Sequence, residues 1–71
     1  MTDQEAAAGS ELTPRLGKVA RRELALNGYT RYEQLAAVTP AQLLSIHGVG
    51  PKVIRILFEE LAERGLALQD T

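Results

Sequence analysis

The chain has 71 residues, a formal net charge of −1 and a hydrophobic fraction of 45%, with only three aromatic side chains, Tyr29, Tyr32 and Phe58. This length fits one small domain with an aliphatic core, and it leaves no room for a large active-site cleft. The absence of cysteine and the single histidine exclude a disulfide framework and a zinc cluster. We therefore expect no enzyme activity, no metal and no cofactor. The lack of a basic leader or a long apolar run predicts a cytoplasmic location.

Charge is segregated along the chain. Residues 1–11 carry −3, residues 12–58 carry +5 and residues 59–71 carry −3. A basic segment between acidic ends is compatible with a polyanion as the ligand. The composition predicts a disordered acidic tail over residues 1–11, a folded domain over residues 12–68 and a frayed end over residues 69–71.

The first helix is predicted over residues 14–27. Thr13 suits the N-cap and Pro14 the first helical position, and the Asn27-Gly28 pair is a typical stop. Gly17 is a weak point inside this helix. Its apolar residues are expected to face the core, and they are Leu16, Val19, Ala20 and Leu24.

Two short helices and one longer helix follow. Thr30 and Glu33 predict a capping box for a helix over residues 31–37, and the TPAQ sequence predicts a second box for a helix over residues 40–45. The last helix is predicted to begin at Pro51 and to run to about residue 64. Its expected apolar face comprises Val53, Ile54, Leu57, Phe58 and Leu61. No segment has the alternation typical of a strand.

The sequence SIHGVGPK, residues 45–52, connects the last two predicted helices. Gly48 and Gly50 permit positive φ angles in a tight turn, and Val49 can place its side chain in the core. The backbone N–H groups of Gly48, Gly50 and Lys52 would then lie near the positive end of the last helix, where a phosphate is favoured. Lys52 and Arg55 add positive charge there. The alternative is a tight turn that serves packing only.

The segment IHGVGPK resembles the helix-hairpin-helix motif. The longer run from ARRELALNGYTRYEQL to ERGLAL is similar to the C-terminal domain of the bacterial RNA polymerase α subunit and to small stand-alone relatives. This resemblance implies an all-α, SAM-like compact bundle of four to five short helices, and DNA binding with little sequence preference. Gly48, Gly50 and Lys52 match the positions that contact the DNA backbone in that family. The arginine that the family uses from its first helix falls near Val19, two or three positions from Arg21 and Arg22.

These observations predict weak, non-specific binding of double-stranded DNA. The predicted nucleic-acid-binding residues are Gly48, Val49, Gly50, Lys52, Arg55, Arg21 and Arg22. A protein-interaction adaptor is the alternative, with the acidic FEELAERG helix facing a basic partner. A basic patch around the hairpin would favour DNA, whereas a patch interrupted by Glu23 and Glu59 would favour the adaptor. The sequence leaves the oligomeric state open.

Other side chains are expected to have structural roles. Tyr29 and Tyr32 are predicted to be half-buried packing residues. Glu59, Glu60 and Glu63 are predicted to form a solvated face, in which Glu60 and Arg64 are spaced for an ion pair.

Overall fold

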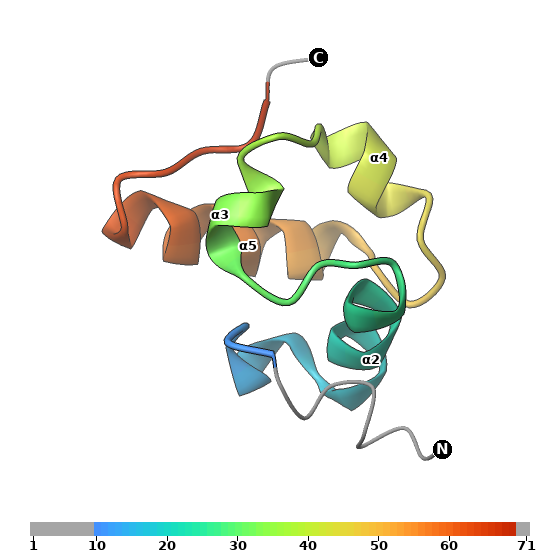
Figure 1. The fold of residues 1–71 in the computed structure, drawn as a ribbon. Helices are drawn as coiled ribbons and strands as arrows, with labels where there is room; N and C mark the ends of the chain where they lie inside the picture. Colours follow the sequence, from blue (N-terminus) through green and yellow to red (C-terminus); the bar gives the residue numbers. More distant parts are fainter. Residues whose placement is uncertain (1–9, 70–71) are drawn as a thin grey trace.

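The computed structural model describes residues 10–69, and this part of the chain is all-α with no strand (Figure 1). A 3₁₀ turn, η1 (Pro14–Leu16), is followed by the α-helices α2 (Lys18–Leu26), α3 (Tyr32–Leu35), α4 (Pro40–Leu44) and α5 (Pro51–Glu63). Helix α5 crosses the molecule and packs against η1 on one side and α4 on the other. The expected all-α class is confirmed. No helix between residues 10 and 69 has the length and apolar character required to cross a membrane.

The expected proline-led starts are confirmed. Thr13 Oγ1 accepts a hydrogen bond from the Arg15 N–H at 3.2 Å, and Pro14 opens η1. Thr39 Oγ1 accepts from the Gln42 N–H at 3.2 Å, while Gln42 Oε1 accepts from the Thr39 N–H at 2.8 Å. This reciprocal pair is the predicted capping box of α4.

The single helix expected over residues 14–27 is wrong, because the chain breaks at Gly17. Gly17 has φ 91° and ψ 157°, outside the helical region, and it separates η1 from α2. The start of α3 also differs: Gln34, rather than Glu33, supplies the capping side chain. Its Oε1 accepts from the N–H groups of Thr30 and Arg31 at 2.7 and 2.9 Å, so α3 begins at Tyr32.

The core is aliphatic, as expected, except for the buried Tyr32. The buried residues are Leu12, Leu16, Ala20, Leu24, Tyr32, Leu35, Val38, Leu43, Val49, Val53, Ile54, Ile56, Leu57, Leu61 and Leu68. Two expected core residues lie outside it: Val19 is 45% exposed and Phe58 is 47% exposed. The inward face of α5 is rotated toward Val53 and Ile56, which places Phe58 on the outer surface.

Both ends of the domain extend beyond the expected boundaries. The Glu11 N–H donates to the Thr30 carbonyl at 2.8 Å, and the Glu11 carboxylate accepts from the Tyr32 N–H at 2.8 Å. Near the other end, the Gln69 N–H donates to the Val38 carbonyl at 2.8 Å. Glu11 and Gln69 are therefore tied to the fold, although they were expected in the tail and the frayed end. The rest of the expected tail, residues 1–9, and residues 70–71 lie outside the described residues.

Candidate nucleic-acid interface

The α4–α5 connection, residues 45–50, is anchored by its own hydrogen bonds and by Val49. Ser45 Oγ donates to the Gln42 carbonyl at 2.6 Å, and the Val49 N–H donates to the Ile46 carbonyl at 3.1 Å. The Val49 residue is only 6% exposed and belongs to the core. Val49 therefore positions the connection from inside, and its side chain is not available to an external ligand.

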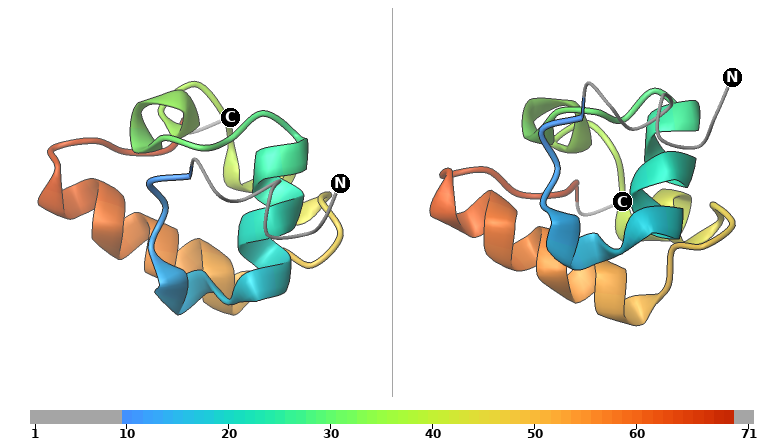
Figure 2. Two further views of the ribbon diagram at one scale, coloured as in Figure 1. Left: turned by 60° about the horizontal axis from the view of Figure 1, so that its bottom comes forward. Right: turned by 90° about the horizontal axis from the view of Figure 1, so that it is seen from below.

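Gly48 is required by the fold. Its φ angle of 85° lies in the region that side chains rarely adopt. A Cβ at this position would lie 2.8 Å from Val19 Cγ1 and 3.5 Å from Glu23 Cγ. The connection therefore packs directly on α2 at Gly48, as the two views in Figure 2 illustrate. This contact also places Val19 beside the turn.

Gly50 is not required by the fold, which corrects the expectation of a positive φ angle. Its φ of −120° and ψ of −174° are extended values that any residue can adopt. No heavy atom lies within 4 Å of the place where its Cβ would be. Gly50 is also the N-cap of α5 and provides no side-chain hydrogen bond there. Ser, Asn or Asp would cap this helix better, so the conformation and packing of the chain do not explain a glycine.

The backbone N–H groups around Gly50 are available. Within residues 10–69, the N–H groups of Gly48, Gly50 and Lys52 have no hydrogen-bond partner. Lys52 is in the first turn of α5, a helix of 13 residues whose dipole places partial positive charge at this end. Unpaired amides at such an end form a suitable site for an anion.

The basic side chains on the same end of α5 are also unpaired. Lys52 and Arg55 are exposed, three residues apart on the outward face, and neither makes an ion pair within the described part of the chain. In contrast, several arginines elsewhere are engaged with carboxylates: Arg15 contacts Glu59 at 3.0 Å, and Arg31 pairs with Glu33. The outward face that begins at Gly50 therefore carries uncompensated positive charge.

Arg21 and Arg22 are engaged with protein groups. Arg21 Nη2 donates to the Ser10 carbonyl at 3.2 Å, and its buried Nε has no hydrogen-bond partner within residues 10–69, so the guanidinium faces Ser10. Arg22 Nη2 contacts Glu23 Oε2 at 3.1 Å. Of the predicted site residues, the structure brings together Gly48, Gly50, Lys52 and Arg55, while Arg21 points to another part of the molecule.

The acidic residues that could interrupt the basic patch differ in their partners and in their distance from the α4–α5 connection. Glu59 is paired with Arg15, and this hydrogen bond raises the pKa of the Arg15 guanidinium above its ordinary value. Glu60, expected to be solvated, has a side chain only 13% exposed that contacts both Arg15, at 3.3 Å, and Arg64, at 3.0 Å. The contact between Glu60 and Arg64 is the ion pair expected from the sequence. Glu23, however, lies directly beside Gly48.

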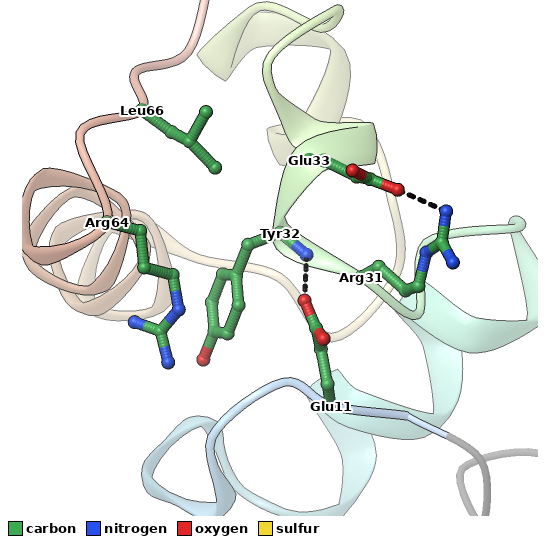
Figure 3. A pocket seen from close by; sticks show the side chains of 6 residues that line it. All are labelled: Glu11, Arg31, Tyr32, Glu33, Arg64 and Leu66. Atoms are coloured by element: carbon green, nitrogen blue, oxygen red, sulfur yellow. Dashed lines mark hydrogen bonds and ion pairs between the residues drawn. The ribbon is translucent and has the colours of Figure 1, made fainter.

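A second concave region, which the sequence did not reveal, lies at the other end of α5. It is an open hollow of about 330 Å³, and its lining consists of Glu11, Arg31, Tyr32, Glu33, Arg64 and Leu66 (Figure 3). Its charged groups already have partners: Arg31 pairs with Glu33, and the Arg64 guanidinium lies 4.0 Å from the centre of the Tyr32 ring. Because charge is balanced here, the hollow does not resemble an anion site.

The described residues contain no group of three or more His, Asp or Glu side chains that could hold a metal ion. Comparison with models of known protein families finds no match, and comparisons with curated proteins and with solved structures also find none. The geometry around Gly50 therefore carries the functional argument.

Proposed function

We propose that the α4–α5 connection and the first turns of α5 bind the phosphate backbone of double-stranded DNA with little sequence preference, in the manner of a helix-hairpin-helix motif. The observation that carries this proposal is Gly50, a glycine that neither the backbone conformation nor the packing requires. A Cβ at this position would enter open space, with no heavy atom within 4 Å. Glycine instead allows a phosphate to approach the unpaired amides closely.

The remaining roles follow from the chemistry of the surrounding groups. The N–H groups of Gly48, Gly50 and Lys52 donate hydrogen bonds to phosphate oxygens, while the side chains of Lys52 and Arg55 provide positive charge. Val49 holds the connection in place. All these contacts are with phosphate, so they position a duplex without reading its bases. The expected site of action is the bacterial cytoplasm.

The proposed affinity is weak. Two uncompensated cations and a few amides neutralise only a small number of phosphates, which corresponds to a dissociation constant in the micromolar range or above, roughly that of non-specific binding. Useful affinity would require a partner, a dimer or several copies on one duplex.

The test is fluorescence anisotropy of a short labelled duplex, titrated with the protein at several salt concentrations. Gly50→Asp introduces a favourable N-cap together with a negative charge at the phosphate position, so the variant should remain folded and lose binding. Gln34→Glu is the matched control. It adds the same charge at α3, and glutamate can still accept the capping hydrogen bonds that Gln34 Oε1 now accepts.

We expect the wild-type protein and Gln34→Glu to bind with similar affinity, and the affinity to fall with increasing salt. Lys52→Gln should reduce the slope of log affinity against log salt by about one, because one phosphate contact is lost. Absence of binding at low salt, or equal binding by Gly50→Asp and Gln34→Glu, would disprove the proposal.

The adaptor alternative has weaker support. It requires the acidic face of α5 to be available to a basic partner, but Glu59 and Glu60 are already paired with Arg15. Its remaining support is the half-exposed Phe58 on the outward face, the exposed Glu63, and the position of Glu23 beside Gly48, where it interrupts the basic patch. A Phe58→Ser variant that binds DNA normally and abolishes an interaction with another polypeptide would favour the adaptor.

A further inference from the structure

The exposed face of α5 has a basic half and an acidic half. Lys52 and Arg55 are exposed in the N-terminal half of the helix. Glu59 and Glu63 are exposed in the C-terminal half, and the half-exposed Phe58 lies between the two pairs. Figure 2 shows α5 along the border of the molecule. The face is therefore accessible to another macromolecule, and its charge changes sign along the helix.

The outermost charges of this face are uncompensated. Lys52 and Glu63 make no ion pair within residues 10–69. They are about three helical turns apart, so they lie on the same side of α5 and are too distant to pair with each other. Phe58 is close to midway between them. The Glu59 carboxylate contacts Arg15 through Oε1, and a carboxylate can accept from a second cation through its other oxygen.

We propose that this face binds a second copy of the chain, with the two α5 helices packed antiparallel about a two-fold axis near Phe58. A face with opposite charges at its two ends is self-complementary in this arrangement, because the acidic half of each helix meets the basic half of the other. Lys52 of each copy then faces Glu63 of the other, and the two Phe58 side chains meet near the axis. A parallel arrangement would place like charges opposite each other. This inference requires no nucleic acid and does not depend on the proposed function.

The self-association should be weak and sensitive to salt. One face of a single helix buries less than the roughly 800 Å² per partner of a standard stable interface. We therefore expect a dissociation constant of about 0.1–1 mM at low salt. The charges are exposed, so added salt should weaken the dimer further. Because Lys52 and Arg55 also belong to the proposed phosphate site, a bound duplex would exclude the second copy.

The experiment follows the backbone amide NMR signals of the isotope-labelled chain on dilution from about 1 mM, at low salt and without DNA. Lys52→Glu and Glu63→Lys each place like charges opposite each other in the antiparallel pair. Each substitution also introduces the charge that the helix dipole favours at its end of α5, so the monomer should remain folded. The matched control is Lys18→Glu, which makes the same change of charge in the first turn of α2. Circular dichroism establishes that the variants are folded.

We expect the α5 signals of the wild-type protein and of Lys18→Glu to shift with concentration, and Lys52→Glu and Glu63→Lys to associate about tenfold more weakly. An equimolar mixture of these last two variants should restore wild-type association, because each copy again presents opposite charges to the other. Absence of any concentration dependence, undiminished association of either variant, or failure of the mixture to associate would overturn the proposal. Because DNA is absent, none of these results bears on the proposed function.

Discussion

Gly48 and Gly50 are two residues apart and have different reasons to be glycine. Gly48 adopts a positive φ angle and packs closely on Val19. Gly50 adopts an ordinary extended conformation with open space beside it. A sequence pattern of Gly-Val-Gly cannot distinguish these cases, because the difference arises from α2, which is distant in sequence. Only the second glycine is informative about a ligand.

This difference leads to a prediction about stability. Gly48→Ala should lower the free energy of unfolding by about 2 kcal/mol, because a positive φ angle is costly for alanine and Val19 would have to move. Gly50→Ser should leave it unchanged or raise it by about 0.5 kcal/mol, since serine is a better N-cap than glycine. Urea denaturation measures both changes. Similar destabilisation by the two substitutions would show that Gly50 also has a structural role.

Tyr32 is a second residue whose environment has a measurable consequence. Its ring is buried and its hydroxyl oxygen accepts a hydrogen bond from the Thr13 N–H at 2.8 Å. Burial raises the pKa of the Tyr32 hydroxyl above its ordinary value of 10, because it disfavours the phenolate. The folded chain therefore favours the neutral form. This contribution to stability is complete below about pH 10, the unfolded value, and is lost as pH rises through the raised pKa of the folded state.

We expect Tyr32→Phe to lower the free energy of unfolding at pH 7 by about 1 kcal/mol, because the Thr13 N–H loses its acceptor. The variant should also lose less stability than the wild-type protein above pH 10, since phenylalanine does not ionise. Urea midpoints at pH 7 and pH 10.5 measure both effects. A parallel alkaline decline in the two proteins would contradict this assignment.

At the scale of elements, the three starts marked by proline were predictable from the sequence, whereas the start of α2 after Gly17, the capping residue of α3 and the orientation of α5 were not. Pro14, Pro40 and Pro51 begin their elements as expected, because N-caps and proline act within one turn of the chain. The expected inward face of α5 contained Phe58, but the observed face is centred near Val53, Ile56 and Leu57. The sequence obscured this orientation because the next residue on that face is the polar Glu60. Its charge is compensated by arginines from outside the helix.

The candidate site was likewise predictable only where it depends on neighbouring residues in the chain. The positions of Gly48, Lys52 and Arg55 follow from a local pattern, and the structure brings them together. The engagement of Arg21 with Ser10 and the approach of Glu23 to Gly48 depend on how α2 packs against other segments. Such contacts between distant segments have no signal in a single sequence.

For the whole molecule, Glu60 connects segments that are far apart in the chain. Its carboxylate contacts Arg15, which belongs to η1, and Arg64, which follows α5 and lies over the Tyr32 ring. The network thus joins η1, α3 and the C-terminal end of α5. At the opposite end of that helix, about 20 Å away by the helical rise, the basic groups are left uncompensated. The Glu60 carboxylate is thus paired with two arginines toward one end of α5, whereas Lys52 and Arg55 toward the other end make no ion pair within residues 10–69.

This arrangement predicts that two neighbouring carboxylates contribute unequally to stability. Glu60→Gln should lower the free energy of unfolding by about 1 kcal/mol, because Glu60 is shielded and serves two arginines. Glu59→Gln should lower it by no more than about 0.5 kcal/mol, because the Glu59 side chain is half exposed and contacts Arg15 alone. A double-mutant cycle between Glu60 and Arg64, measured by urea denaturation, should give a coupling that 1 M salt weakens only in part. Equal effects of the two single substitutions would mean that Glu60 acts as an ordinary surface charge, and that packing alone holds η1 on α5.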